Sequence, residues 1–266
     1  MSVTSTLAPL VLDAEADADI QRRFSGLDRL FGVVPATQVR ASKVAVVGIG
    51  GVGSWTAEAL ARSGVSHLRL IDLDNVSESN INRQIHALSN TIGMAKVDAM
   101  RERIALINPH CQVELVEDFL APDNCASLLE GVDAFIDACD QVQAKTAMAA
   151  WGLRHKVPFI CIGAAGGKRM AWKVEQDDLA HTTHDPLLAQ VRYRLRKQHG
   201  FPKDGKKMNV PCIFSKEAVA GPDPSCAIEG DGSLNCHGYG SSVAVTATFG
   251  MCAASWIFEK IAFSKK

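Results

Sequence analysis

Five side chains of the kinds that bind ribose and phosphate lie between residues 72 and 84. Asp72 ends the apolar run HLRLID, Asp74 follows it, and Asn80, Arg83 and Gln84 come within the next ten residues. A carboxylate at the end of a buried strand accepts hydrogen bonds from ribose hydroxyls. A guanidinium offers phosphate oxygens a rigid fork of donors. This spacing predicts a nucleotide site in which the phosphates are bound and cut, because a site that holds an intact dinucleotide does not need the second group.

Two further charges complete the chemistry expected at this site. Lys96 lies in the next predicted helix and supplies a compact positive charge, and Asp140 follows the run DAFIDAC. Magnesium in nucleotide sites is bound through one or two carboxylates together with the substrate phosphates. We therefore predict that Arg83, Lys96 and Asp140 are catalytic, that the ligand is ATP, and that Asp140 binds Mg²⁺. A set of surface ion pairs is the alternative explanation of these charges.

The element that must position these groups begins with a glycine-rich sequence between the valine-rich run KVAVV and the helical pattern SWTAEALARSG. Its glycines are Gly48, Gly50, Gly51 and Gly53. Glycines allow a tight turn and a close approach of phosphate, and the N–H groups at the start of a helix favour an anion. Because Asp72 lies 19 residues after Gly53, strand, loop, helix and acid together predict a nucleotide-binding unit. This unit alone suits NAD and ATP equally, and only the charged residues described above favour ATP.

The alternation of apolar strands and helices between residues 43 and 167 predicts a Rossmann-like, doubly wound α/β fold with a largely parallel sheet. From residue 168 the pattern becomes irregular, and we expect additional strands and long loops, with a strand pair in KRMAWKVEQDDL. Residues 238–258 contain no charged side chain. We expect a buried C-terminal helix there, or one at a dimer interface, in preference to a membrane span.

The pattern of strands and helices and the composition also limit how the chain can be divided into domains and what it can bind. We expect a mobile tail over residues 1–19 and a single domain over 20–266, with a nucleotide-binding half (41–167) and a half for substrate and dimer contacts (168–266). The net charge is −1 and the sequence pI about 6.7, so binding to nucleic acid requires a local patch. Eight cysteines without a C-x-x-C pair argue against a zinc site, and with no signal peptide they indicate a cytoplasmic protein.

The motifs GIGGVGS, LIDLD, SNINRQ, GMAK and DACD resemble, in order and spacing, those of the ubiquitin-activating-enzyme-like adenylyltransferases. The resemblance implies a role for each matching residue: a ribose contact by Asp72 with Asp74 beside it, phosphate contacts by Asn80, Arg83 and Lys96, and a magnesium-linked carboxylate at Asp140. It also implies an N-terminal arginine that the partner subunit places over the phosphates. The segment QRRFSGLDRLFG offers Arg23 and Arg29 for this role.

Other segments indicate a narrower family within these adenylyltransferases. FGVV, AEALARSG, INRQIHAL, FSKEA and VTATFG are similar to those of the bacterial tRNA threonylcarbamoyladenosine dehydratases, over about residues 21–258. That family implies ATP-dependent cyclisation of N6-threonylcarbamoyladenosine at position 37 of tRNA to a hydantoin, through a carboxyl-adenylate, with release of pyrophosphate and AMP. It further implies a homodimer and, as an additional partner, a sulfur-transfer protein.

Two other functions are open at this point. One is activation of the C-terminal glycine of a ubiquitin-like sulfur carrier, with Cys212 or Cys236 as thiol acceptor, although such relatives usually have two zinc-binding C-x-x-C pairs. The other is a non-catalytic NAD-binding module, which leaves Arg83 and Lys96 without a role. We expect no cysteine to be essential, because ring closure by a nitrogen of the same molecule needs no covalent intermediate with the protein. We expect His86 to be structural.

The basic stretch between Arg192 and Lys207 is the predicted tRNA contact. Its only acid is Asp204, and Tyr193 and Phe201 can stack on bases of an anticodon loop. Seven of its 16 residues are basic: Arg192, Arg194, Arg196, Lys197, Lys203, Lys206 and Lys207. The alternative is a solvated helix face and loop.

Overall fold

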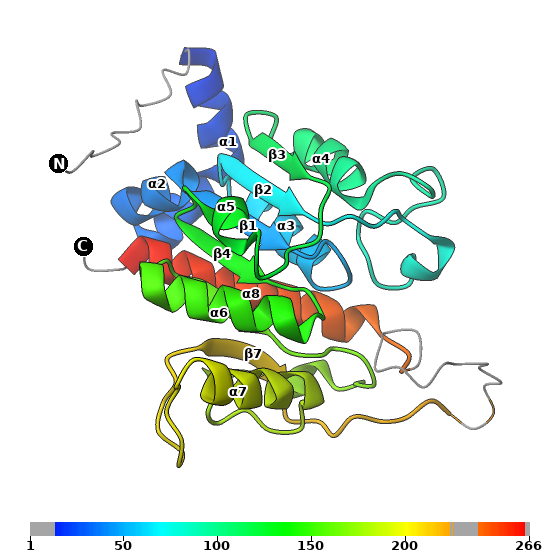
Figure 1. The fold of residues 1–266 in the computed structure, drawn as a ribbon. Coiled ribbons are helices and arrows are strands. Elements are labelled where there is room, and N and C mark those ends of the chain that lie inside the picture. The colour runs from blue at the N-terminus through cyan, green and yellow to red at the C-terminus, as the bar shows by residue number, and fades with distance from the viewer. Residues whose placement is uncertain (1–13, 224, 226–238, 264–266) are drawn as a thin grey trace.

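The computed structural model describes residues 14–223, 225 and 239–263, and its centre is a seven-stranded sheet in the order β3-β2-β1-β4-β5-β7-β6 (Figure 1). Every neighbouring pair is parallel except β6 and β7, which are antiparallel. The strands are β1 Lys43–Val47, β2 His67–Ile71, β3 Gln112–Val116, β4 Ala134–Asp137, β5 Phe159–Ile162, β6 Val174–Asp178 and β7 Pro211–Ser215. The expected doubly wound, largely parallel sheet is confirmed.

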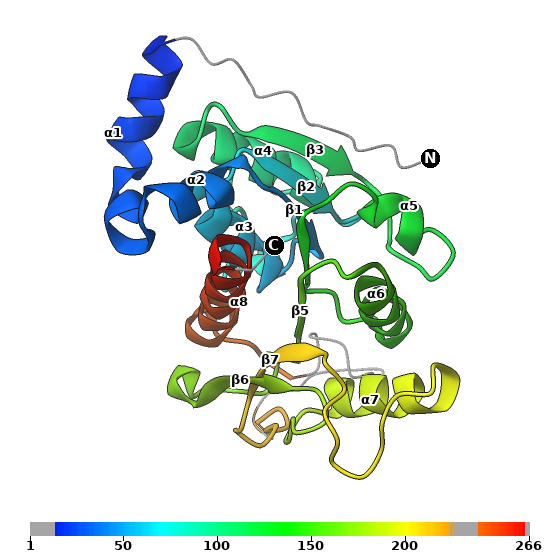
Figure 2. The ribbon, with the colours of Figure 1, turned by 90° about the vertical axis from the view of Figure 1, so that its left-hand side faces the viewer.

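Helices cover both faces of this sheet (Figure 2). They are α1 Ala14–Phe31, α2 Val33–Ala41, α3 Gly53–Arg62, α4 Lys96–Ile107, α5 Cys125–Leu129, α6 Val142–His155, α7 Pro186–Gln198 and α8 Val243–Phe263, with the 3-10 helices η1 Glu78–Asn80 and η2 Ala171–Lys173. On one face α3, α4 and α8 pack on the sheet through Leu60, Met100 and Phe249, and on the other α5, α6 and α7 pack through Leu129 and Met148. Because β1 and β4 are buried on both faces, residues 44–47 and 134–136 are apolar and do not alternate with polar residues; the charged residues Lys43 and Asp137 stand at the strand ends.

The chain leaves the two central strands in opposite directions. β1 is followed by β2 and then β3 on one side, whereas β4 is followed by β5 on the other. The loops that follow β1 and β4 therefore diverge at the carboxyl edge of the sheet, and the crevice between such loops is where open α/β sheets bind ligands. The glycine loop, residues 72–84 and residues 138–140 all follow strands at this edge.

The N-terminal region differs from the sequence-based expectation. Helix α1 begins at Ala14, so residues 14–19 of the expected tail are helical; residues 1–13 lie outside the described part of the chain. An ion pair one helical turn apart, between Arg23 and Asp19 (2.7 Å), supports the helix. Phe24 anchors it to the body of the protein, because its ring packs against Gly64 at the end of α3.

The region after residue 168 also differs. The segment KRMAWKVEQDDL forms one strand, β6, and its partner is β7 later in the chain, so the strand pair expected within this segment is wrong. Helix α7 was not expected as an element. Pro186 occupies its first turn, and the Asp185 side chain caps it by accepting a hydrogen bond from the N–H of Leu188 (2.9 Å).

The uncharged segment 238–258 contributes most of α8, and the expected buried helix is confirmed. Val245, Phe249, Ala253 and Ile257 are fully buried at intervals of four residues, which places them along one face against the core. Gly250 allows α8 to approach α3 closely, because a Cβ there would lie 2.7 Å from the carbonyl oxygen of Val52. Over the described residues, none of the helices combines the length and apolarity needed to cross a membrane.

Candidate active site

The loop after β1 is closely packed on one side and open on the other. Gly48 has a φ of 88°, and a Cβ there would lie 2.9 Å from the carbonyl oxygen of Ala138. A Cβ on Gly53 would overlap the carbonyl oxygen of Gly48, whereas a Cβ on Gly50 would have no described atom within 4 Å. Helix α3 begins at Gly53, so its first backbone N–H groups lie at the end of this loop. This arrangement suits a bound phosphate.

Asp72 holds the glycine loop from the neighbouring strand. Its Oδ2 accepts a hydrogen bond from the N–H of Ile49 (2.6 Å), and its Oδ1 accepts one from the N–H of Asp74 (2.9 Å). Burial raises the pKa of Asp72, and the positive charge of Lys96 and the two N–H groups oppose this increase. Asp72, the residue predicted to bind the ribose, therefore also fixes the shape of the glycine loop.

Arg83 lies beside the glycine loop. A Cβ on Gly51 would lie 3.4 Å from Arg83 Cδ. The Arg83 Nη1 donates to the carbonyl oxygen of Ser79 (2.7 Å) and to Asn82 Oδ1 (3.0 Å), and its backbone carbonyl accepts a hydrogen bond from Trp55 Nε1 of α3 (2.9 Å). The side chain is therefore anchored by its own turn and by the helix that follows the glycine loop.

The two predicted amides near Arg83 are buried and differ in their contacts. Asn80 shapes the turn, because its Oδ1 accepts a hydrogen bond from the N–H of Ser77 (3.1 Å). Gln84 Oε1 and both ring nitrogens of His86 have no hydrogen-bond partner among the described residues. Burial, with the positive charges of Lys96 and Arg103, lowers the pKa of His86 to about 4, so this ring is neutral near pH 7.

Lys96 lies next to the two predicted acids. Its Nζ is 2.6 Å from Asp74 Oδ2 and 3.9 Å from Asp72 Oδ1. Lys96 is buried, whereas the Asp74 side chain is 54% exposed. The structure therefore brings Asp72, Asp74 and Lys96 together at the carboxyl edge, beside the glycine loop that Asp72 holds.

Asp140 is exposed and follows β4 at the same edge. The residue two positions earlier, Ala138, packs directly on the glycine loop at Gly48. Over the described residues, no group of three or more His, Cys, Asp or Glu side chains could hold a metal ion. A magnesium ion at Asp140 therefore requires oxygen ligands from the ATP phosphates, which is the usual mode for this ion.

A buried ion pair that the sequence analysis missed supports the loop of Asp140. Lys145 Nζ lies 2.9 Å from Asp137 Oδ1, and both side chains are almost completely buried. The same Nζ donates to the carbonyl oxygen of Ile162 (2.7 Å), so the pair joins β4, α6 and β5. The only sequence signal was a lysine within an otherwise apolar helical pattern.

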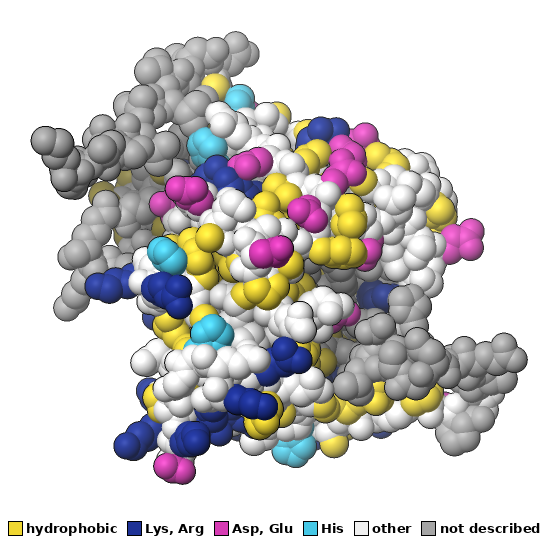
Figure 3. All heavy atoms as spheres, viewed as in Figure 1, with side chains coloured by type: hydrophobic (Ala, Val, Ile, Leu, Met, Phe, Trp, Pro, Cys, Tyr) yellow, Lys and Arg dark blue, Asp and Glu magenta, His cyan; other side chains and the backbone are white. Residues whose placement is uncertain are grey.

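The predicted tRNA-binding stretch lies away from the glycine loop. It includes the end of α7 and the loop that leads into β7, and because β7 is parallel to β5 this loop lies at the amino edge of the sheet. Figure 3 shows the dark-blue side chains gathered at the lower left, over this region of Figure 1. The stretch is therefore separated from the predicted phosphate site by the length of the strands.

The basic residues of this stretch have different surroundings. Arg192 is turned inward, where its Nη1 donates to the carbonyl oxygens of Leu179 (2.9 Å) and Thr182 (3.0 Å). Arg196 Nε donates to the carbonyl oxygen of Pro202 (3.0 Å). Arg194 is half-buried and lines a cavity next to α6. The exposed members are Lys197, Lys203, Lys206 and Lys207.

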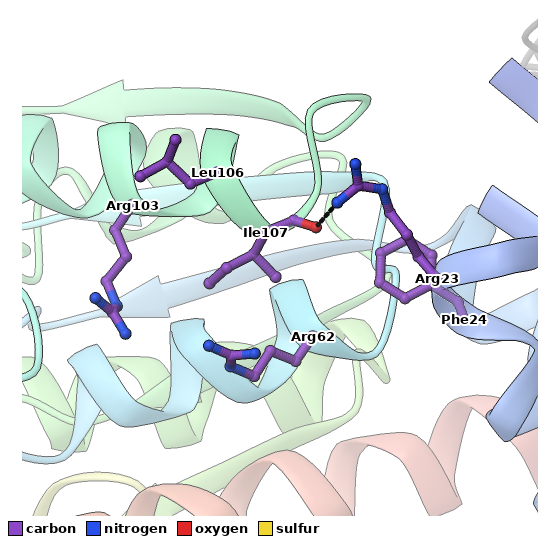
Figure 4. A pocket seen from close by; sticks show the side chains of 6 residues that line it. All are labelled: Arg23, Phe24, Arg62, Arg103, Leu106 and Ile107. Carbon is purple, nitrogen blue, oxygen red and sulfur yellow. Dashed lines mark hydrogen bonds between the residues drawn. The ribbon is translucent and has the colours of Figure 1, made fainter. Parts of the chain in front are cut away.

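The two candidate N-terminal arginines also lie at the amino edge. Arg23 Nη1 donates to the carbonyl oxygen of Ile107 at the end of α4 (3.3 Å), and Arg29 is exposed on the last turn of α1. Figure 4 shows Arg23, Arg62 and Arg103 around a cavity of about 440 Å³. Arg62 and Arg103 both pair with the buried carboxylate of Glu58 in α3, at 2.7 and 2.6 Å, which accounts for these two arginines. Neither candidate approaches the glycine loop of its own chain.

The cysteines with described surroundings are buried or half-buried. Burial raises the pKa of Cys111 and Cys125 to about 12, which keeps these thiols protonated and unreactive near neutral pH. Cys212 is fully buried in β7, so it is not accessible as an acceptor thiol. Cys236, the other candidate acceptor, lies outside the described residues.

Comparisons with known proteins show the family of the chain. The chain is 43% identical to the tRNA threonylcarbamoyladenosine dehydratase of Escherichia coli and 41% identical to that of Haemophilus influenzae, each over 91% of this chain and 94% of the relative. Its structure is similar to the E. coli enzyme crystallised with ATP, with a TM-score of 0.82 and 42% identity over 91% of this chain and 94% of that one. The ThiF family profile matches residues 27–263. The chain belongs to the ThiF family.

Proposed function

We propose that this protein catalyses the ATP-dependent dehydration of N6-threonylcarbamoyladenosine at position 37 of tRNA. The observation that carries the proposal is that the open glycine loop, Asp72 and Arg83 meet at one edge of the sheet. The chain that contains this site is similar to dehydratases over nearly its whole length. The E. coli relative has also been crystallised with AMP, the nucleotide that such a reaction releases. Cyclisation through a carboxyl-adenylate accounts for all of these features.

The reaction has two steps. A threonyl carboxylate oxygen attacks the α-phosphorus of ATP, the bond to the pyrophosphate oxygen breaks, and the carboxyl group becomes an acyl-adenylate. The nitrogen that joins the carbamoyl group to adenine then attacks the acyl carbon, loses its proton and expels AMP, which closes the hydantoin ring. Ring closure within one molecule has an effective molarity of roughly 10⁵–10⁸ M when the groups are well oriented, so the protein's work lies mainly in the first step.

The residues of the site suit the adenylation step. Arg83 and Lys96 stabilise the negative charge that develops on the phosphates, which is the main contribution of proteins to phosphoryl and nucleotidyl transfer. Asp72 binds the ribose, with Asp74 beside it, and Asn80 and Gln84 complete the turn over the phosphates. Asp140 would hold Mg²⁺ together with the phosphates, and the ion would supply positive charge for the adenylation step.

Further parts of the proposal concern partners. Arg194 and the exposed lysines at the amino edge, Lys197, Lys203, Lys206 and Lys207, contact the phosphate backbone of the tRNA, while the modified nucleoside enters at the carboxyl edge. The protein acts as a homodimer in which Arg23 or Arg29 of one subunit covers the phosphates of the other, and a sulfur-transfer protein is a further partner. Residues 41–167 bind the nucleotide, and residues 168–266 contribute the contacts with tRNA and the second subunit.

Mass spectrometry of tRNA nucleosides tests the proposal. Purified protein with ATP, Mg²⁺ and tRNA that carries threonylcarbamoyladenosine should convert this nucleoside into a product lighter by one water, with one AMP and one pyrophosphate per turnover. NAD in place of ATP should give no product. If no dehydrated nucleoside forms but a sulfur-carrier protein becomes adenylated at its C-terminal glycine, the dehydratase assignment is wrong.

A further inference from the structure

The loop that follows β5, residues 163–170, contains a buried lysine that the proposed chemistry does not use. Lys168 is only 2% exposed. Its Nζ donates to the carbonyl oxygens of His184 (3.0 Å), Ser215 (3.2 Å) and Glu217 (2.8 Å). An ammonium group has three N–H donors, so each of them has a partner. A neutral amine would leave one of these carbonyls without a donor.

The three carbonyl groups belong to two segments that are far apart in the sequence. His184 precedes α7, whereas Ser215 ends β7 and Glu217 lies two residues later. His184 has a φ of 57°, a left-handed conformation that is uncommon for a residue other than glycine. Lys168 therefore joins its own loop to both segments at the carboxyl edge, and it holds the segment of His184 in a conformation that this residue does not readily adopt alone.

Two buried acids bind the ends of the same loop. Asp185 Oδ2 accepts a hydrogen bond from the N–H of Ala164 (2.9 Å) at the beginning of the loop. Glu217 Oε2 accepts hydrogen bonds from the N–H groups of Arg169 (2.9 Å) and Met170 (2.7 Å) at its end. Burial lowers the pKa of Lys168, and Asp185 and Glu217 oppose this change. The lysine thus balances the charge of both acids that fix the loop.

The loop is connected to the phosphate-binding turn. The N–H of Gly167 donates to the carbonyl oxygens of Tyr239 (3.2 Å) and Gly240 (3.0 Å). The next residue, Ser241, accepts a hydrogen bond through its carbonyl oxygen from Asn82 Nδ2 (3.1 Å), and Asn82 is the neighbour that holds Arg83. A continuous set of contacts therefore runs from Lys168 to the turn of Arg83.

We propose that Lys168 is a positioning residue, whose ammonium group serves as a built-in cation that fixes the 163–170 loop beside the nucleotide for the incoming nucleoside. This inference rests on the proposed function. The three carbonyl oxygens surround Lys168 Nζ in the way that carbonyl oxygens coordinate a bound cation. This arrangement suits a small, compact positive group. Arginine cannot replace it, because a planar guanidinium is larger and directs its donors in a fork.

The test compares Lys168→Met and Lys168→Ala with a matched control, Lys216→Met. Lys216 directly follows β7, is exposed, and pairs with Glu175 (2.7 Å) instead of with the loop. We expect both Lys168 variants to bind ATP as the wild type does in calorimetric titration, and to form dehydrated nucleoside about 10²-fold more slowly, the scale expected when reacting groups are misplaced. The control should keep the wild-type rate.

Ammonium chloride distinguishes positioning from a general effect on folding. In the folded Lys168→Ala enzyme, NH₄⁺ should occupy the three carbonyl oxygens and restore part of the rate, whereas tetramethylammonium chloride at equal ionic strength, which has no N–H donor, should not. A folded Lys168→Met enzyme with the wild-type rate would overturn the inference, as would a slow Lys168→Ala enzyme that ammonium does not restore.

A second variant covers the case in which the Lys168 substitutions do not fold. Glu217→Ala removes the acceptor of the Arg169 and Met170 N–H groups but keeps the carbonyl that Lys168 contacts. It should also slow dehydration with ATP affinity unchanged, and a wild-type rate would contradict the role of the loop. If the wild-type protein itself forms no dehydrated nucleoside, the proposed function fails, and this outcome is separate from any result with the variants.

Discussion

Lys96 and Asp74 form an ion pair in which Nζ and Oδ2 are 2.6 Å apart, at the point where the phosphates of ATP are expected. Asp74 is the exposed partner and Lys96 the buried one. A phosphate can therefore replace the Asp74 carboxylate as the partner of Lys96 without moving the lysine. The carboxylate keeps the buried charge paired in the absence of nucleotide, which avoids the cost of an isolated buried ion.

Replacing Lys96 by methionine should reduce the rate of pyrophosphate release by about 10²–10³, the usual effect of removing one group that stabilises developing charge. Methionine keeps much of the apolar stem, so the fold should persist by circular dichroism. Lys43→Met is the control, because Lys43 begins β1 at the opposite edge of the sheet and pairs with Glu114 of β3. A Lys96→Met enzyme with normal pyrophosphate release would remove Lys96 from the site.

Alanine at Gly50 and at Gly53 should have opposite effects. Gly53→Ala should destabilise the protein by about 1–3 kcal/mol, because its Cβ overlaps the Gly48 carbonyl oxygen and the loop must shift. Gly50→Ala should leave the free energy of unfolding almost unchanged and weaken ATP binding, because its methyl group enters the open side of the loop. Urea denaturation and calorimetric titration of both variants check the two expectations, and unchanged ATP affinity in Gly50→Ala would place the phosphates elsewhere.

Asp140→Asn should lower turnover by about 10²–10³ and raise the Mg²⁺ concentration needed for half-maximal activity. The amide keeps the size of the side chain but not its charge. Asp123→Asn, an exposed aspartate before α5, serves as the control. Pyrophosphate release measured across a magnesium titration tests this expectation, and an unchanged magnesium dependence would show that Asp140 is not a ligand of the ion.

Neutralising Lys206 and Lys207 together should weaken tRNA binding and reduce its salt dependence by about one unit of slope for each lysine that binds a phosphate. ATP affinity should not change, because both lysines lie at the amino edge of the sheet. The charge-matched control replaces Arg22 and Arg101, which are exposed on other helices. Filter binding at several salt concentrations gives the slopes, and equal slopes for the double variant and the wild type would show that neither lysine binds the tRNA.

His86 should make the protein less stable in acid. Its folded pKa is about 4 and its ordinary value 6.5, so the unfolded chain takes up the proton first as the pH falls below 6.5. Stability is full above 6.5 and is lost progressively down to about 4, by about 3 kcal/mol at about 1.4 kcal/mol per pKa unit. Denaturant unfolding of His86→Gln across this range should show a smaller loss, and identical pH profiles would assign the effect to other groups.

The parts of the site that the sequence predicts are those in which local sequence determines local structure. The glycines of the β1–α3 loop are required by the turn itself, and Asp72 follows from its place at the end of a strand. Both statements depend on a few consecutive residues and on the general geometry of α/β units. For this reason the sequence alone is enough to describe the carboxyl edge of β1 and β2.

The parts that the sequence does not predict depend on contacts between distant segments. Lys168 meets three carbonyl groups from two segments that are distant from it in the sequence, and nothing near it in the sequence distinguishes it from a surface lysine. Arg192 illustrates the reverse case, since it belongs to a basic stretch but donates to the Leu179 and Thr182 carbonyl groups inside the protein. Composition gives the charge of a stretch, whereas only the fold gives the direction of each side chain.

The position of α8 has a consequence for how the protein is made. This helix lies latest in the order of elements, yet Phe249 and Ile257 fill the core beneath β1 and β4, against the helix that follows the glycine loop. During translation the strands and helices of the nucleotide-binding half emerge from the ribosome first, and the part of the sheet face that α8 covers stays exposed until α8 has been synthesised. The nascent chain therefore exposes the apolar residues that α8 later covers, and we expect it to bind chaperones that recognise such surfaces.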